Sequence, residues 1–393
     1  MSTFSFNKFN DKHGFIYFTL TFMLILAAAS APTPLYQLYQ AEFHFSTLML
    51  TLIFSVYALS LLGTLLIAGS ISDYVGRKPV VLASLCLMIL AMMIFYFSST
   101  TSHLLFARAA QGIGTALATS TLCAIIIEID EEKGAKVNSF APMAGMGLGM
   151  LMTCTVFTFN RTPLKTVFLV LIILLACALL SLSFTQETGS KKKGVLRSLR
   201  PSIGIPKEER NKLAVISPIN IALWMLSGLY LSLMPSLILD SIENKNIWVN
   251  GSAFLLLTLF ASGATLVVGK IKHVMLIGIM LLLFGVALIL IGVNQSITVL
   301  MLTGSICSGI GFGYCFMGEL SFLMKGVKDK GNVISVFYIE SYLSFCIPIL
   351  LTSLAMNIFN MSLVSAANLY GVLIIVLLIS ALFIQLKISN YTA

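Results

Sequence analysis

Charged residues are scarce in this chain of 393 residues, where Asp, Glu, Lys and Arg together make up 10% of the sequence. Soluble proteins contain about 25% of these residues, because charged side chains cover the surface that faces water. So small a share excludes a soluble enzyme, an intrinsically disordered chain and a nucleic-acid-binding protein.

Cysteine and histidine are present but lack the spacings that hold metals. The seven cysteines are odd in number, all fall in apolar stretches, and no pair has C-x-x-C spacing. We interpret them as small buried packing residues, with no disulfide and no metal. The four histidines form no H-E-x-x-H motif, so an intramembrane zinc protease is not supported. We therefore expect no enzyme activity and no bound cofactor.

Hydrophobic residues, by contrast, make up 58% of the chain, and its mean hydropathy is +0.99. Apolar runs separated by short polar turns predict twelve helices, each near the roughly 20 residues that cross a membrane. They cover residues 14–38, 45–69, 79–98, 102–127, 138–159, 165–185, 213–236, 247–269, 274–293, 297–323, 332–357 and 362–386. We therefore expect an all-α membrane protein with 12 transmembrane helices.

One long polar segment, 186–212, leaves six predicted helices on each side. We expect an N-terminal six-helix half over 1–185, a cytoplasmic central loop over 186–212 and a C-terminal six-helix half over 213–393. Internal similarity favours two pseudo-symmetric halves, because Gln111-Gly112-Ile113-Gly114 lines up with Ser308-Gly309-Ile310-Gly311, 197 residues later. Parallel repeats of this kind occur in transporters.

The distribution of basic residues predicts the orientation in the membrane. With the N-terminus in the cytoplasm, twenty of the 24 Lys and Arg fall on the cytoplasmic side, three on the opposite side and Arg108 within a span. Cytoplasmic loops collect Lys and Arg, so this bias explains the net charge of +9 without nucleic acid. We expect a multi-pass protein of the cell inner membrane, with both termini in the cytoplasm.

The loop after the second predicted helix reads G-S-I-S-D-Y-V-G-R-K. It resembles the G-x-L-[AS]-D-x-x-G-R-[RK] signature of the major facilitator superfamily of transporters. The matching residues are Gly69, Ser72, Asp73, Gly76, Arg77 and Lys78. The resemblance implies a gate on the cytoplasmic side, where we expect Asp73 to bind the start of a neighbouring helix near Asn332.

The fourth predicted helix carries a second resemblance. Its segment from Arg108 to Gly114 is similar to the R-x-x-Q-G-x-G pattern of proton-coupled drug antiporters in the superfamily. An arginine within a span costs about 3 kcal/mol or more, so Arg108 either acts on a nearby acid or an anionic substrate, or pairs structurally near the outer interface. The glycine ladder of the fifth helix ends in Gly149-Met150, where the antiporter pattern has Gly-Pro.

Thirteen of the fifteen acidic residues lie in predicted loops or at helix ends, which leaves Glu319 and Glu340 inside spans. Buried carboxyl groups are costly and are by default functional, so both are candidates for proton coupling, together with Arg108. Glu340 is the better candidate because it lies about 12 Å from the start of its helix. Glu319 is close enough in sequence to Lys325 to form a structural pair instead.

The resemblance also implies that the first, fourth, seventh and tenth helices line a central substrate cavity. The candidates on these helices and on the second are Tyr36, Gln37, Tyr57, Gln111, Asn220, Trp224, Tyr230 and Tyr314. Packing, or a place at the membrane interface, is the alternative for each. Pro32 and Pro34 predict a break in the first helix.

These features predict a secondary active transporter that moves a small organic molecule by alternating access, with proton-coupled export as the leading hypothesis. The alternatives are a proton-coupled uptake symporter for a metabolite and, in another class, a membrane sensor or interaction protein on a transporter scaffold. We expect a monomer whose partners are a small-molecule substrate, protons and membrane lipid. The proton gradient, with no cofactor, is the expected energy source.

Overall fold

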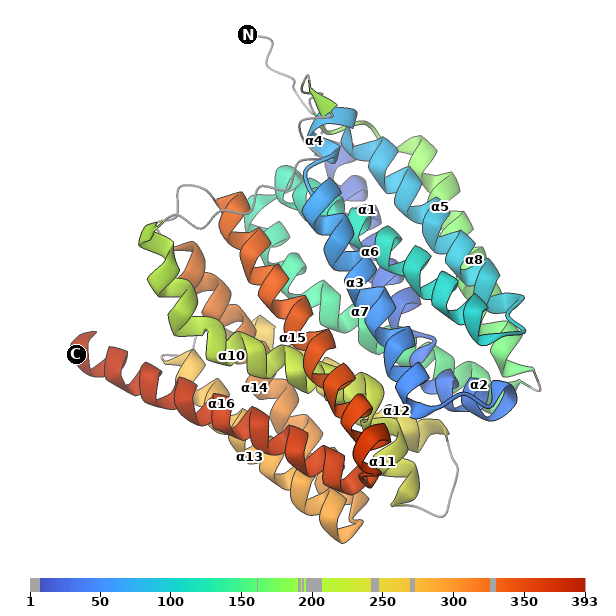
Figure 1. Ribbon diagram of the computed structural model, residues 1–393. Coiled ribbons are helices and arrows are strands. Elements are labelled where there is room, and N and C mark those ends of the chain that lie inside the picture. The colour runs from blue at the N-terminus through green and yellow to red at the C-terminus, as the bar shows by residue number, and fades with distance from the viewer. Residues whose placement is uncertain are drawn as a thin grey trace.

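The computed structural model describes residues 8–160, 162–189, 192, 194–195, 207–241, 247–268, 273–325 and 330–392 (Figure 1). Every regular element within these residues is a helix. The long helices are α1 (Lys8–Ser30), α3 (Thr47–Ala68), α5 (Arg77–Tyr96), α6 (Thr101–Ile129), α7 (Glu131–Phe159), α8 (Pro163–Ser181), α10 (Lys207–Ser232), α12 (Ile247–Val267), α13 (Val274–Gln295), α14 (Thr298–Met324), α15 (Lys330–Phe359) and α16 (Leu363–Thr392). The short ones are η1 (Thr33–Leu35), α2 (Tyr36–Phe43), α4 (Ser72–Val75), η2 (Leu182–Phe184) and α11 (Met234–Asp240).

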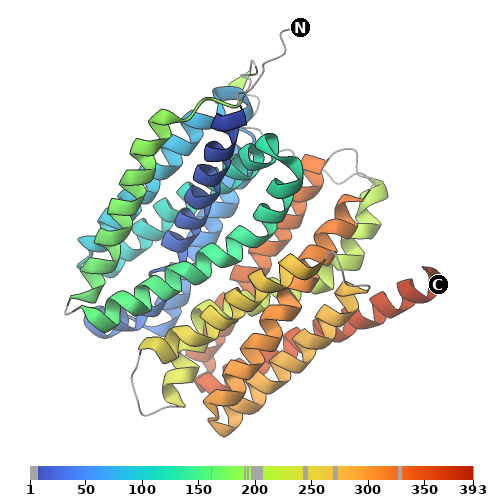
Figure 2. The same ribbon diagram turned by 180° about the vertical axis from the view of Figure 1, so that it is seen from behind.

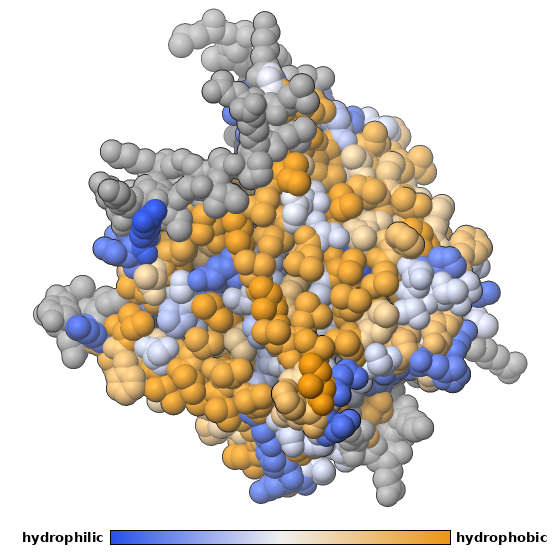
Figure 3. All heavy atoms as spheres, in the orientation of Figure 1, coloured by the Kyte–Doolittle hydropathy of each residue, from blue (hydrophilic) through white to orange (hydrophobic). Residues whose placement is uncertain are grey.

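The expected twelve spans are confirmed. Within the described residues, eleven helices are long and apolar enough to cross a membrane, and Gly251–Val267 of α12 is a shorter apolar helix. Apolar side chains dominate the face of the molecule in Figure 3, as expected of a surface that faces lipid. The chain is therefore a multi-pass, all-α membrane protein.

The helices up to α8 pack together on one side of the molecule and those from α10 onward on the other (Figures 1 and 2). We call these the first and second halves. The end of the bundle that carries α4 is the loop end, and the end that carries α2 and α11 is the distal end (Figure 1). Most of the predicted central loop, 186–212, lies outside the described residues, so the domain boundaries there stay a prediction.

The first helix of each half is broken near the distal end. The predicted break in the first helix is confirmed, because α1 ends at Ser30 and α2 begins at Tyr36 after a short turn that contains Pro34. A corresponding break in the seventh helix was not predicted. There α10 ends at Ser232 and α11 begins at Met234, with Pro235 in its first turn, where a missing N–H costs nothing.

The glycines of the predicted repeat make equivalent contacts in the two halves. A Cβ on Gly112 of α6 would meet the carbonyl oxygen of Tyr57 in α3. A Cβ on Gly309 of α14 would lie 2.6 Å from the carbonyl oxygen of Leu257 in α12. Only glycine permits so close an approach of two helices, so the same packing of α6 on α3 recurs between α14 and α12.

Hydroxyl groups join the two halves toward the distal end. The buried Thr51 Oγ1 of α3 lies 2.6 Å from Ser353 Oγ of α15 and 3.1 Å from Ser232 Oγ of α10. Trp248 Nε1 of α12 donates to Thr158 Oγ1 of α7 over 2.6 Å. These bonds hold the halves together on the side opposite to α4.

The fifth helix begins seven residues earlier than expected, at Glu131 in place of residue 138. Asp130 caps it, since its carboxylate accepts the backbone N–H of Lys133 over 3.0 Å and pairs with the Lys133 ammonium over 2.8 Å. These bonds to Lys133 lower the pKa of Asp130 below its ordinary value. Polar residues that favour helix starts thus extend the helix beyond its apolar run.

Candidate functional site

Arg108 is buried in the first half, seven residues from the distal start of α6, with 2% of its surface exposed. Its Nη1 donates to the carbonyl oxygen of Ala29 over 2.9 Å and to Gln111 Oε1 over 2.5 Å. Gln111 Nε2 in turn donates to the carbonyl oxygen of Ala28 over 2.8 Å. These carbonyls are available because α1 is about to end at Ser30, so the break in the first helix supplies the acceptors for the arginine.

Three aromatic rings surround the Arg108 guanidinium. Its Cζ lies 5.2 Å from the ring centroid of Tyr36, 5.1 Å from that of Phe54 and 5.0 Å from that of Tyr57. Such cation–π contacts partly replace the water that burial removes. No carboxylate of the described residues forms an ion pair with Arg108. The buried side chain is therefore surrounded by neutral polar groups and aromatic rings.

The second half holds a polar cluster around Glu340. Asn220 Nδ2 of α10 donates to Glu340 Oε2 of α15 over 2.8 Å, and Ser341 Oγ donates to Asn220 Oδ1 over 2.9 Å. Asn220 and Ser341 are fully buried, whereas Glu340 is partly exposed. Asn220 thus fixes the position of one carboxyl oxygen of Glu340, and the carboxyl group is not fully buried.

Glu319 of α14 has a different environment, because it is fully buried and neither of its carboxyl oxygens has a hydrogen-bond partner among the described residues. The considered pair with Lys325 is not present: the described part of the chain has no ion pair between them, and the Lys325 carbonyl accepts a bond from Lys212 Nζ. Glu319 interacts electrostatically with Glu340. The two intramembrane acids therefore belong to one site near the loop end of the second half.

Aromatic side chains occupy the region between the arginine and the acids. The ring centroids of Trp224 and Tyr342 are 4.9 Å apart, and those of Tyr342 and Tyr338 are 6.2 Å apart. Tyr57 lies on α3 of the first half, which packs on α15, the helix that carries Tyr338, Glu340 and Tyr342. These rings connect the surroundings of Arg108 to those of the acids.

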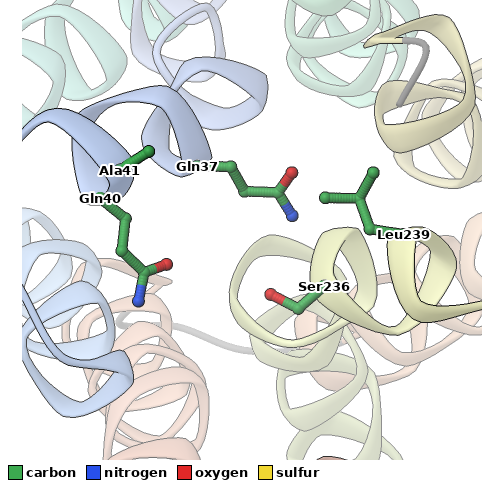
Figure 4. A pocket seen from close by; sticks show the side chains of 5 residues that line it. All are labelled: Gln37, Gln40, Ala41, Ser236 and Leu239. Atoms are coloured by element: carbon green, nitrogen blue, oxygen red, sulfur yellow. The ribbon is translucent and has the colours of Figure 1, made fainter. Parts of the chain in front are cut away.

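The remaining cavity candidates are more scattered. Tyr230 is fully buried and its hydroxyl has no partner among the described residues, while Tyr314 is half-buried and makes no hydrogen bond or ring contact there. Gln37 lines a pocket of about 320 Å³ between α2 and α11 at the distal end (Figure 4). Its other lining residues are Gln40, Ala41, Ser236 and Leu239.

The loop from Gly69 to Lys78 is held by charges of the first half. Arg77 pairs with Asp73 over 2.6 Å and with Glu128 of α6 over 2.7 Å, and it donates to Ser72 Oγ over 2.6 Å. Gly76 adopts a φ of 109°, which glycine tolerates and other residues rarely do. Asp73 was expected to bind the start of the eleventh helix, but its described partners are Arg77 and Lys192.

This loop geometry and the twelve helices agree with the family comparison. A model of the Major Facilitator Superfamily matches residues 18–347. The chain belongs to this superfamily. Membership of this superfamily points to a membrane transporter in preference to an enzyme.

Curated relatives match shorter stretches of this superfamily member. The multidrug resistance protein MdtL of Citrobacter koseri is 30% identical over 157 residues, which are 38% of this chain and 39% of the relative. MdtL of Shewanella oneidensis is 39% identical over 95 residues, or 24% of each chain. Monosaccharide-sensing protein 3 of Arabidopsis thaliana is 34% identical over 106 residues, or 26% of this chain and 14% of the relative. The chain thus matches well under half the length of these relatives.

One residue of the loop end, Glu187, was not predicted to act there. Glu187, which follows η2, accepts the backbone N–H groups of Arg77 over 2.8 Å and of Lys78 over 3.1 Å, so it caps the start of α5. Lys78 Nζ donates to the carbonyl oxygen of Thr185 over 2.6 Å. The only sequence signal for Glu187 is that an acid follows the sixth helix, in a segment where basic residues predominate.

Proposed function

We propose that this transporter exports a small organic molecule in exchange for protons, and that Glu319 carries the proton. The observation that carries the proposal is the fully buried carboxyl group of Glu319, which has no hydrogen-bond partner among the described residues. An ionised carboxylate in that position lacks both water and a counter-charge, so the neutral, protonated form is favoured. A conformation that admits water favours release of the proton, which is what coupling requires.

Glu340 supports this role as the neighbouring acid. The two carboxyl groups lie close enough to interact electrostatically. Glu340 is partly exposed and held by Asn220 over 2.8 Å. We infer that Glu340 passes protons between Glu319 and water. Both acids lie near the loop end, so this path opens toward the cytoplasm if the termini are cytoplasmic, as the bias of basic residues favours.

Export is the favoured direction because two of the relatives are named multidrug resistance proteins. We expect the transporter to act as a monomer in the inner membrane, driven by the proton gradient. Uptake with protons is the alternative that the following experiment separates.

The test uses inverted membrane vesicles that contain the full chain and have an acidified lumen. Adding a transported compound from outside makes an exporter release protons from the lumen, which a pH-sensitive dye records. We expect wild-type vesicles to respond to some compounds of a panel of aromatic dyes and antibiotics. Glu319→Gln should give no response at equal protein level, because an amide cannot carry the proton.

The control is Glu132→Gln, which removes an acid whose side chain is 83% exposed and pairs with Lys136 at the surface. This variant should respond like the wild type. A full response from Glu319→Gln contradicts its assigned role. A wild-type response that appears only when the compound is loaded inside the vesicles indicates uptake in place of export.

A further inference from the structure

We propose that the transported molecule is an aromatic anion, and that Arg108 and Tyr36 bind its negatively charged group. This inference rests on the proposed transport function and adds the chemical class of the substrate. Its basis is the combination of a buried cation without an acidic partner among the described residues, buried donors without described acceptors, and aromatic rings on helices that join the two halves.

The charge of Arg108 is the first step. The guanidinium is buried, and its polar contacts are neutral: the Ala29 carbonyl and the Gln111 amide oxygen. Buried arginines are usually paired with an acid, because a lone buried charge is costly. Neither Glu319 nor Glu340 pairs with it, since no described ion pair involves Arg108. An anion that arrives with the substrate would complete the pair.

Donors without acceptors on the guanidinium, on Tyr36 and in the η1 turn just before Tyr36 are the second step. The Nε of Arg108 and the hydroxyl groups of Tyr36 and Thr33 are buried, and the described residues offer none of them a hydrogen-bond acceptor. The Tyr36 oxygen itself faces the Arg108 guanidinium. Tyr36 and Thr33 are 1% and 2% exposed. Buried donors without acceptors are destabilising, and all three of these groups can donate. A carboxylate offers several lone pairs and would satisfy more than one of them.

The aromatic surroundings are the third step. Tyr57 lies against the guanidinium and belongs to α3, which packs on α15 of the second half, the helix that carries Tyr342. Tyr342 in turn packs on Trp224, whose Nε1 is a further buried donor without a described partner. Flat rings prefer offset or edge-to-face contacts with other rings, so a ligand that spans the two halves here is itself expected to be aromatic.

A cationic substrate does not fit this arrangement. Arg108 would repel it, and the two buried or half-buried acids lie at the other end of the helices. Arg108 is seven residues from the distal start of α6, whereas Glu319 is five residues from the loop end of α14. The first predicted helix, residues 14–38, contains no acid in the sequence. Cation recognition thus lacks a described carboxylate at the three rings that surround Arg108.

The test measures binding of three compounds with one ring system and different charge: naphthoate, naphthamide and naphthylmethylammonium. Calorimetric titration of the purified full chain should give the tightest binding for naphthoate and the weakest for the cation. Arg108→Gln should weaken naphthoate binding about tenfold or more, the effect of one lost charge-assisted hydrogen bond. The same change should leave naphthamide binding nearly unaltered.

Two further variants keep the test decisive if Arg108→Gln fails to fold. Tyr36→Phe keeps the ring and removes the unpartnered hydroxyl, so it should weaken naphthoate binding a few-fold and spare the cation. Lys136→Gln removes a cation whose side chain is 68% exposed and should change nothing. Equal binding of naphthoate and the cation by the wild type, or unchanged naphthoate binding in Arg108→Gln, would overturn the proposal.

The vesicle assay separates this inference from the proposed function. If cations trigger proton release from the vesicles and anions do not, the anion site is refuted, while proton-coupled export remains supported. If naphthoate binds tightly but no compound moves protons, proton coupling is refuted, while the anion site at Arg108 remains supported.

Discussion

Arg108 in the first half and Glu319 in the second are the two charged side chains buried among the described residues, and their surroundings differ in kind. The arginine has carbonyl, amide and aromatic contacts on several sides. The glutamate has no hydrogen-bond partner in the described part of the chain. A permanent charge needs such compensation, whereas a carboxyl group can become neutral by binding a proton.

Arg108 and Glu319 differ in their surroundings although the helices of the two halves pack in the same way. With the offset of 197 residues, Arg108 corresponds to Ser305 and Gln111 to Ser308, while Gly112 corresponds to Gly309. The glycines keep the same helix contacts, and the positions of the hydrogen-bonded Arg108 and Gln111 correspond to two serines in the second half. One scaffold therefore carries a fixed cation in one half and titratable acids in the other.

The largest expected effect tests the shared scaffold. Gly112→Ala and Gly309→Ala should each destabilise the protein by about 3 kcal/mol, because the new methyl group would press on a backbone carbonyl of the neighbouring helix. Thermal unfolding in detergent measures this. Gly63→Ala and Gly263→Ala are matched controls, since a Cβ at either position meets nothing within 4 Å. If Gly309→Ala kept the wild-type stability while Gly112→Ala lost it, the two halves would not share this helix packing.

Replacing each of the two buried ionisable side chains, Arg108 and Glu319, by methionine should affect stability differently. Arg108→Met leaves the carbonyl of Ala29 and the amide oxygen of Gln111 without their donor, which should cost about 2 kcal/mol of stability. Glu319→Met breaks no described hydrogen bond and should be neutral or stabilising. The same unfolding measurement applies. Equal losses in both variants would mean that Glu319 has partners of its own in the folded protein.

The sequence predicted local features well because their causes are local. Apolar runs place the spans, and the prolines after Ser30 break the first helix. The break in the seventh helix shows the limit, since the single Pro235 could equally have begun a loop beyond the span. The break in the seventh helix is recognised by comparison with the corresponding break in the first helix.

Partners across the fold were harder to predict than the residues themselves. Asp73, Arg108 and Glu340 are recognisable as candidates because a charge in or beside a span is rare. Their contacts depend on which helices meet. Neither the bond from Asn220 to Glu340, 120 residues apart, nor the cap of Glu187 on Arg77, 110 residues apart, has a local signal.

A smaller effect is expected within the acid site. Asn220→Ala removes the donor to Glu340 and the acceptor of Ser341, so proton release in the vesicle assay should fall about tenfold. Ser341→Ala removes only the outer bond and should have a milder effect. The first half offers a comparison, because neither change should alter naphthoate binding at Arg108. A stronger loss in Ser341→Ala than in Asn220→Ala would contradict this order of contacts.

The smallest effect concerns the loop end, where the first half carries the acid of the loop signature and the corresponding second-half segment, 269–272, has none in the sequence. Asp73→Asn should slow transport about threefold, since the amide cannot neutralise Arg77 but Glu128 and Ser72 still hold it. Naphthoate binding should stay unchanged, which separates slower turnover from a damaged binding site. Complete loss of transport would instead place Asp73 on the proton path with Glu319, so that proton coupling would involve both halves.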